Sequence, residues 1–314
     1  MTSALRVLVT GGAGYIGTTL VPGLLQAGFH VTVLDNLMYG QATLLDCCSN
    51  ARFDFIRGDI RDFELTKRLL SRFDVVIPLA SIVGAPACKR DPVSARDVNL
   101  DAHLNLVKNS SNDQWLLFPT TNSGYGIGDA DELCTEESPL RPISAYARTK
   151  VEVEEAFLEK GNAITYRLAT VFGMSPRMRM DLLVNDFVYR ALKDRVLVLF
   201  EEHFRRNYIH VKDVANAFMF GLQSFDNMKG EPYNVGLSSA NLTKRELAEK
   251  IKSHVPELYI HSASIGEDPD KRDYLVSNDK LESLGWRSEH TLDDGIRELV
   301  IGYGIIRPNI FANV

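Results

Sequence analysis

The sequence predicts an α/β fold with a doubly wound parallel sheet. Apolar strand patterns alternate with helical patterns through the first half of the chain, and a glycine triplet, Gly11, Gly14 and Gly17, joins the first strand to the first helix. An acidic residue, Asp35, ends the second strand. Such alternation is typical of a parallel sheet covered by helices on both faces, with ligands at the carboxyl ends of the strands.

The first half of the chain supplies the elements of this sheet. Apolar runs predict strands at 5–10, 30–35, 53–57, 74–80 and 115–120. Amphipathic spacing predicts helices near 15–27, 62–71, 93–110 and 144–160. We assign residues 1–168 to a Rossmann-type dinucleotide-binding domain.

The pattern is less regular after about Arg167. Helical spacing recurs at 181–193, 212–224, 243–254 and 291–303, and an apolar run predicts a strand at 196–200. We predict that residues 169–314 form mainly a smaller substrate-binding lobe, with some segments returning to the main sheet.

The composition excludes several classes of protein. The 314 residues are 45% hydrophobic and 24% charged, which is typical of a globular protein, and the net charge of −6 offers no basic surface for nucleic acid. No apolar leader or run of membrane-spanning length is present, so we predict a cytoplasmic protein without a membrane partner. The four cysteines lack the paired spacing of a metal site, and no metal is expected.

The glycine turn predicts a dinucleotide site. Gly11 permits a tight turn, Gly14 lets the backbone approach a pyrophosphate, and Gly17 lets the helix lie close to the strand. The helix amino terminus offers N–H groups to phosphates, and Asp35 can accept both ribose hydroxyls. Because Asp35 would repel a 2′-phosphate, NAD is favoured over NADP. Glycines at the first turn of any parallel α/β protein are the plain alternative.

A tyrosine and a lysine lie one turn apart on the helix predicted at 144–160. Tyr146 and Lys150 share one face because they are four residues apart. A nearby ammonium can lower the pKa of a phenol, so Lys150 could prepare Tyr146 to act as a base. By itself, such a pair is also common on helix surfaces.

Small hydroxyl and amide side chains follow the strand at 115–120. Thr121, Asn122 and Ser123 stand where a parallel sheet would present a substrate hydroxyl to them. Ordinary turn chemistry would also select these residue types.

Taken together, these motifs resemble the extended short-chain dehydrogenase/reductase superfamily, and within it the NAD-dependent nucleotide-sugar epimerase/dehydratase family typified by UDP-glucose 4-epimerase. The resemblance covers nearly the whole chain. Its motifs include Gly58-Asp59-Ile60, Thr120-Thr121 before Tyr125-Gly126, Tyr146-x-x-x-Lys150 and Arg206-Asn207-Tyr208-Ile209-His210-Val211.

The resemblance implies roles for individual residues. The implied catalytic residues are Thr121, Tyr146 and Lys150, and the implied substrate-binding residues are Thr121, Asn122, Ser123, Asn185, Arg206 and Arg272. Arginine suits the substrate diphosphate because its fork donates two hydrogen bonds to phosphate oxygens. The implied cofactor-binding residues are Gly11, Gly14, Tyr15, Ile16, Gly17, Asp35, Asn36, Leu37, Asp59, Ile60, Leu79, Ala80, Ser81, Asn99, Tyr146 and Lys150.

Other interpretations remain for several of these residues. Arg206 follows Arg205, and the two could form a solvated charge pair. His210 looks structural in its motif. Arg177 and Arg179 could face a substrate phosphate or solvent.

The chain departs from the family pattern at two places. The 4,6-dehydratases carry Asp-Glu after the catalytic threonine, and here Asn122 and Ser123 stand instead, so the acid and base of water elimination are missing. Thr170 replaces an asparagine that contacts the nucleotide in many epimerases, which leaves the nucleotide open.

We therefore expect an NAD-dependent nucleotide-sugar 4-epimerase of carbohydrate biosynthesis, acting through a 4-keto intermediate on a nucleotide-diphosphate sugar. A 4-dehydrogenase or 4-ketoreductase is the first alternative, since Thr, Tyr and Lys serve both. A 4,6-dehydratase is less favoured, and a non-catalytic NAD-binding protein is the least favoured. The family also implies a homodimer through the helices at 93–110 and 144–160, although their apolar residues could equally cover their own sheet.

Overall fold

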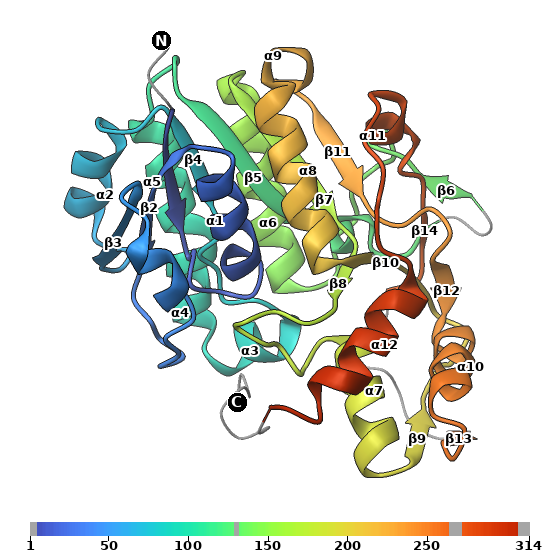
Figure 1. Cartoon of the computed structure of the whole chain (residues 1–314). Coiled ribbons are helices and arrows are strands. Elements are labelled where there is room, and N and C mark those ends of the chain that lie inside the picture. Colours follow the sequence, from blue (N-terminus) through green and yellow to red (C-terminus); the bar gives the residue numbers. More distant parts are fainter. Residues whose placement is uncertain (1–4, 129–131, 264–271, 307–314) are drawn as a thin grey trace.

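A computed structural model describes residues 5–128, 132–263 and 272–306, and its centre is a seven-stranded sheet (Figure 1). The strand order is β11-β7-β5-β4-β1-β2-β3, and every neighbouring pair is parallel. The order reverses between β1 and β4, which is the place where a doubly wound sheet binds its ligand. The predicted fold class is confirmed.

The strands of this sheet agree with the predicted ones where a prediction was made. They are β1 (Arg6–Thr10), β2 (His30–Asp35), β3 (Phe53–Arg57), β4 (Val75–Pro78), β5 (Trp115–Thr121), β7 (Ala163–Leu168) and β11 (Pro232–Val235). The last two were not predicted. β11 comes from the second half of the chain and forms the edge beside β7.

Helices cover both faces of the sheet, because successive strand residues point to opposite sides. Val7 and Val9 of β1 belong to one core, and Leu8 belongs to the other. The first core lies under α1 (Gly17–Gln26), α8 (Val211–Gln223) and α9 (Phe225–Met228). The second lies under α2 (Phe63–Leu70), α5 (Ala102–Asn109) and α6 (Ala145–Lys160).

The helix expected at 93–110 is interrupted. The chain forms α3 (Ala85–Arg90), α4 (Pro92–Arg96), a π-helical turn (Asp97–Asp101) and then α5. Such single π turns often mark functional positions. Three short helical segments, each of one turn or little more, also occur. They are Leu45–Ser49, Asn122–Tyr125 and α11 (Asp279–Ser283).

The remaining elements form a smaller lobe at the carboxyl ends of the sheet. Its helices are α7 (Leu183–Lys193), α10 (Lys244–His254) and α12 (Leu292–Gly302). Its strands are β6 (Leu133–Cys134), β8 (Thr170–Phe172), β9 (Val196–Leu199), β10 (Arg205–His210), β12 (Asn241–Thr243), β13 (Tyr259–Ser262) and β14 (Leu275–Val276). β10 is the central strand of a three-stranded sheet. Its two neighbours, β8 and β12, are far apart in the sequence.

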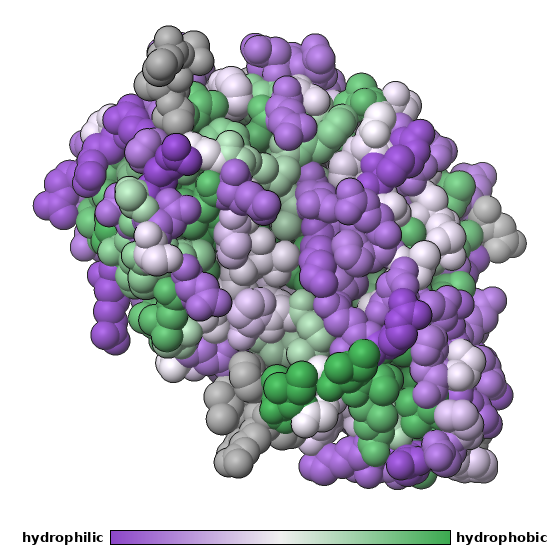
Figure 2. Space-filling view, in the orientation of Figure 1, coloured by the Kyte–Doolittle hydropathy of each residue, from purple (hydrophilic) through white to green (hydrophobic). Residues whose placement is uncertain are grey.

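The face shown in Figure 2 mixes hydrophilic and hydrophobic areas, and one of the hydrophobic areas lies near the end of α12, where Ile301 and Ile305 are exposed. None of the helices in the described ranges combines the length and the apolar character that crossing a membrane would require.

Candidate active site

The turn between β1 and α1 has the close approaches that the glycine triplet predicts. Gly11 has a φ of 69°, and a Cβ there would lie 2.5 Å from backbone atoms of Ala80. A Cβ on Gly17 would lie 2.4 Å from the Gly12 carbonyl oxygen. Any larger residue at these positions would therefore push the turn away from β4 or α1 away from β1.

The amino terminus of α1 is suited to an anion. Its N-cap residue, Ile16, offers no capping side chain, and the first turn carries no acidic residue. Several backbone N–H groups and the positive end of the helix dipole therefore point toward the glycine turn. A dinucleotide diphosphate would suit this end of the helix. A Cβ on Gly14 would lie 3.0 Å from the Gly11 carbonyl oxygen, so a larger residue there would crowd the turn.

The ends of β2 and β3 bring together the residues predicted to contact the ribose and the adenine. Asp35 accepts hydrogen bonds from the N–H groups of Ala13, at 3.0 Å, and Leu37, at 2.8 Å. Burial raises the pKa of Asp35, while these bonds oppose the rise. Asn36 donates to Asp59, which also pairs with the neighbouring Arg61. Ile60 is buried beside them.

Asn99 lies in the π-helical turn and holds the loop after β4, which contains Leu79, Ala80 and Ser81. Its amide oxygen accepts from Ser81 Oγ and from the Ile82 N–H, both at 2.8 Å, and its amide nitrogen donates to the Ile82 carbonyl at 2.8 Å. The same amide lies 3.7 Å from Cys88 Sγ. Asn99 thus positions the loop expected to line the cofactor, and it is almost fully buried.

Tyr146 and Lys150 lie in the first turns of α6 in different electrostatic surroundings. Burial raises the pKa of Tyr146 to about 12, and the positive charges that oppose this rise are those of Arg179 and Arg272. Burial lowers the pKa of Lys150 to about 7. Its Nζ donates to the Pro119 carbonyl at 3.2 Å. The charges that act on the pKa of Tyr146 do not include that of Lys150, so the expected effect of Lys150 on this pKa stays a prediction.

The segment after β5 connects the catalytic candidates. Thr121 Oγ1 donates to Ser123 Oγ at 2.9 Å, and Arg272 donates to the same Ser123 oxygen. A Cβ on Gly124 would lie 3.2 Å from Val151, the residue after Lys150, so α6 lies close against this segment. Arg272 thus contacts the Thr121 segment while its charge acts on Tyr146.

Arg206 is a buried residue rather than half of a solvated charge pair. Only 3% of its surface is exposed, and its neighbour Arg205 pairs with Asp273 at 3.0 Å. The Arg206 guanidinium lies 5.9 Å from the ring centre of Tyr274, and burial raises the pKa of Tyr208, with the charges of Arg206 and Arg272 opposing the rise. Both predicted phosphate-binding arginines therefore act on the same buried tyrosine.

Asn122 follows Thr121, its amide atoms are buried, and no hydrogen-bond partner is found for them within the described ranges. Its amide is therefore available to a polar group of a bound molecule, although it carries no charge with which to act as a base.

Asn185 does not face this site. It is fully buried, its amide oxygen accepts from the Gly173 N–H at 3.0 Å, and its amide nitrogen donates to the Arg179 carbonyl at 2.8 Å. Direct contact with a substrate, as predicted, does not fit this placement, because both amide groups hold the chain between β8 and α7. The amide nitrogen also donates to the Tyr15 hydroxyl at 3.3 Å. Sequence alone does not reveal this role, because two of the three partners are backbone atoms and the third lies 170 positions earlier in the chain.

His210 has the structural role expected for it. It is the N-cap of α8, where its Nδ1 accepts from the Lys212 N–H at 3.3 Å. Its Nε2 lies 2.7 Å from a Glu298 carboxylate oxygen. Since Nδ1 accepts, the neutral ring carries its hydrogen on Nε2.

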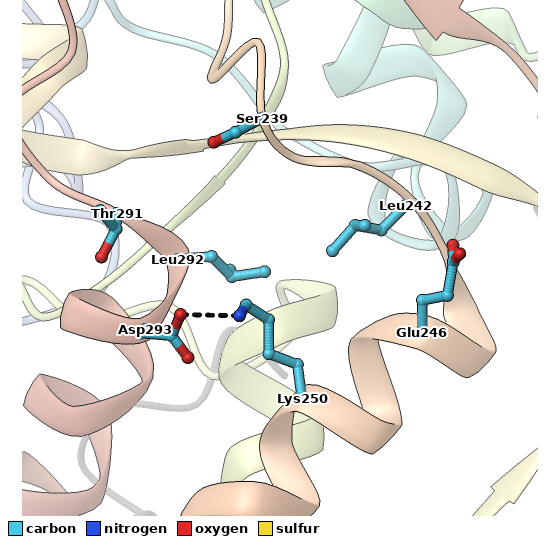
Figure 3. A pocket seen from close by; sticks show the side chains of 7 residues that line it. All are labelled: Ser239, Leu242, Glu246, Lys250, Thr291, Leu292 and Asp293. Carbon is cyan, nitrogen blue, oxygen red and sulfur yellow. Dashed lines mark ion pairs between the residues drawn. The ribbon is translucent and has the colours of Figure 1, made fainter.

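A cavity of about 350 Å³ lies elsewhere, in the smaller lobe between α10 and α12 (Figure 3). Leu242 and Leu292 line its wall, and Lys250 reaches across it to Asp293, at 2.7 Å. None of the predicted catalytic or cofactor residues lines it, so it is separate from the candidate active site. Within the described ranges, no group of three or more His, Cys, Asp or Glu side chains is placed to hold a metal ion.

The low pKa of Lys150 makes a testable prediction. The folded value of about 7 lies below the ordinary 10.5, so the unfolded chain binds more protons between these pH values and stability rises with pH across that range. Lys150→Met should therefore stabilise the ligand-free protein at pH 7 by roughly 1–3 kcal/mol and flatten this rise. Urea denaturation between pH 7 and pH 10 measures both effects.

Lys160→Met, at the last turn of the same helix, is the matched control. Its ammonium donates to the Ser110 carbonyl at 2.8 Å, and it is only half-buried, so we expect no gain in stability. An equal gain in both variants would show that the change reflects added apolar surface rather than a disfavoured charge.

Comparison with known proteins identifies the family. Residues 7–236 match the NAD dependent epimerase/dehydratase family. A UDP-glucose 4-epimerase of Mycolicibacterium smegmatis is 31% identical, with 94% of this chain and 97% of the relative covered. The low-salt glycan biosynthesis protein Agl12 of Haloferax volcanii is 31% identical over 95% of this chain and 98% of its own.

A solved structure agrees with these relatives. The UDP-glucose 4-epimerase of Thermus thermophilus, in complex with NAD, superposes with a TM-score of 0.81 at 30% identity and covers 96% of this chain and 99% of its own. The family resemblance predicted from the motifs is confirmed. The predictions that the protein is an enzyme and that its cofactor is NAD are confirmed as well. The chain belongs to the NAD-dependent epimerase/dehydratase family.

Proposed function

We propose that the protein is a nucleotide-sugar 4-epimerase that works through a 4-keto intermediate. One observation carries the proposal: Arg272 donates to Ser123, which is bonded to Thr121, and the charge of the same arginine acts on Tyr146. A residue suited to bind a diphosphate thus lies beside both parts of a proton-transfer pair. The similarity to proteins named UDP-glucose 4-epimerase supports this assignment.

The proposed roles follow from the surroundings of each side chain. Arg206 and Arg272 would hold the diphosphate, and Thr121 would donate to or accept from the C4 hydroxyl while Tyr146 takes its proton. When bound, NAD supplies the acceptor and then the donor of the C4 hydride. The diphosphate must stay fixed while the keto sugar turns to present its other face, so firm contacts belong at the arginines and loose ones around the hexose.

The same surroundings disfavour water elimination. Asn122 is neutral, and Ser123 is engaged by Thr121 and Arg272, so the two positions that would carry an acid and a base hold neither.

The test is to incubate the purified protein with UDP- and dTDP-hexoses and follow the products by NMR and the cofactor by absorbance. We expect the two C4 epimers to reach the same equilibrium from either side, without net NADH and without a released keto sugar. Net NADH or a free keto sugar would instead establish a 4-dehydrogenase or 4-ketoreductase and overturn the proposal.

We further propose a cytoplasmic homodimer with a nucleotide-diphosphate sugar as its substrate. Sedimentation of the purified protein tests the dimer directly, and a monomer at assay concentrations would contradict it.

A further inference from the structure

The connection between β8 and α7, residues 173–182, crosses the carboxyl end of the main sheet. In Figure 1 this yellow-green segment runs beneath α1 toward α3. It carries Arg177 and Arg179, which are only 2% and 9% exposed. Two arginines buried at the ligand-binding end of a sheet are not ordinary surface charges, because burying a guanidinium is costly unless it meets a partner.

The connection is fastened to the glycine turn. Ser175 Oγ donates to the Tyr15 carbonyl at 2.7 Å and lies 2.9 Å from Thr18 Oγ1. The Tyr15 hydroxyl donates to the Gly173 carbonyl at 2.6 Å, and the Arg177 N–H lies 3.4 Å from Thr18 Oγ1. Tyr15 and Thr18 flank the amino terminus of α1, so the segment lies directly against the place where the cofactor diphosphate fits.

Arg177 reaches the loop that follows β2 and Asp35. Its guanidinium carbon lies 4.0 Å from the ring centre of Tyr39, in the loop after β2. Burial raises the pKa of Asp35, and the positive charge of Arg177 opposes that rise. Arg177 therefore helps to keep the ribose-binding carboxylate ionised.

Arg179 lies close to the start of α3 and to Tyr146. It pairs with Asp181 through two hydrogen bonds, of 3.1 and 2.5 Å, and a Cβ on Gly84 would lie 3.9 Å from its guanidinium. Gly84 precedes α3, and the charge of Arg179 acts on Tyr146. The charge of Arg177 thus acts on Asp35, the predicted ribose acceptor, and that of Arg179 on Tyr146, the catalytic candidate.

We propose that residues 173–182 form a strap along the bound dinucleotide and that Arg177 and Arg179 are cofactor-binding residues, Arg177 at the adenosine ribose and diphosphate and Arg179 at the ribose and phosphate on the nicotinamide side. The glycine turn at 11–19 has no basic side chain of its own, and Arg177 and Arg179 are the basic residues of the segment that is hydrogen-bonded to it. An arginine fork is well matched to a phosphate. The inference rests on the NAD site described above and not on the sugar chemistry.

The test uses cofactor-free protein without any sugar and measures the affinity and release rate of NAD and NADH by calorimetry and NADH fluorescence. We expect Arg177→Gln and Arg179→Gln each to bind 10–100-fold more weakly and to release NADH faster, with the larger loss at low salt. Arg190→Gln is the matched control, because Arg190 lies on the adjoining α7 in an exposed pair with Asp186 and should leave both values unchanged.

Arginine-to-lysine variants separate binding from folding. They keep the charge but lose the fork, so Arg177→Lys and Arg179→Lys should bind cofactor with an affinity between wild type and the glutamine variants. If Arg177→Gln fails to fold, Arg179→Gln and the two lysine variants decide the question. Glutamine variants that fold and bind NAD with wild-type affinity would overturn the strap. If only the lysine variants fold, wild-type NAD affinity in both of them would overturn it.

The failure of this inference can be told from the failure of the proposed function. Strap-dependent NAD binding in a protein that epimerises no sugar would support the strap and refute the 4-epimerase. If the wild type epimerises a sugar while Arg177→Gln and Arg179→Gln bind NAD normally, the 4-epimerase is supported and the strap is refuted.

Discussion

Tyr146→Phe is expected to lower epimerisation by roughly 10²–10⁴-fold while leaving NAD binding intact. The substitution removes one oxygen atom from a half-buried side chain at the start of α6, so the helix and the predicted cofactor site should keep their shape. Only the proton transfer at the C4 hydroxyl is lost. Steady-state epimerisation, together with calorimetric binding of NAD, separates the two effects.

The pH dependence of the wild type gives a second measure of the same residue. The pKa of Tyr146 is raised to about 12 in the ligand-free protein, so the phenolate fraction rises with pH throughout the neutral and alkaline range. Activity should therefore increase from pH 6 to pH 9, and the residual activity of Tyr146→Phe should lack that increase.

Tyr259→Phe is the control for Tyr146→Phe. Tyr259 lies on β13 of the smaller lobe, 62% exposed, and its loss should change neither rate nor pH profile. Turnover of Tyr146→Phe at the wild-type rate would remove the phenol from the mechanism, and the base would have to be sought elsewhere.

The main sheet was predictable because its signals are local. The five predicted strands and the helix around Tyr146 lie within a few residues of their observed bounds, since apolar runs and helical spacing are set by neighbouring residues. β10 carries no such signal. Its Arg205-Arg206-Asn207 segment is polar, and it becomes a strand because β8 and β12 lie on either side of it.

The interruption of the helix at 93–110 shows the same limit. Periodicity predicts a continuous helix, but the π-helical turn at Asp97–Asp101 places Asn99 against Ser81 and Ile82. One extra residue in a turn hardly changes the spacing of apolar side chains, so the sequence could not reveal it.

The candidate site was predictable where a motif fixes a residue to the end of its own strand or helix. Thr121, Tyr146 and Asp35 lie at such ends. Arg179 acts on Tyr146 from a connection more than thirty positions further along the chain. Its place depends on how the smaller lobe folds over the sheet, and an Arg-x-Arg pattern alone fits solvent equally well.

The second large effect is expected at a buried ion pair beneath the site. Arg167 of β7 pairs with Glu154 of α6 at 2.6 Å, and their side chains are 6% and 2% exposed. Arg167 also donates to the Tyr125 hydroxyl at 3.1 Å, and that hydroxyl donates to Asn234 of β11 at 2.7 Å. The pair therefore joins the helix that carries Tyr146 to the segment that follows Thr121.

Arg167→Ala should lower the free energy of unfolding by about 3–5 kcal/mol, because it leaves the Glu154 carboxylate buried without its partner. Replacing both residues by apolar ones, Arg167→Met with Glu154→Leu, should restore most of that loss, since no unpaired charge remains. Chemical denaturation measures both. A loss below about 1 kcal/mol in Arg167→Ala would mean that Glu154 tolerates isolation and that the pair is not what holds these elements together.

The double variant also separates stability from positioning. If Arg167 only stabilises the fold, restoring stability restores the turnover number. Because Arg167 also holds Tyr125, four residues after Thr121, we expect the stable double variant to keep a turnover number about tenfold below wild type, with KM nearly unchanged. Full recovery of the turnover number would show that Arg167 acts only on stability. A persistent deficit would show that Arg167 also helps to align Thr121 with Tyr146.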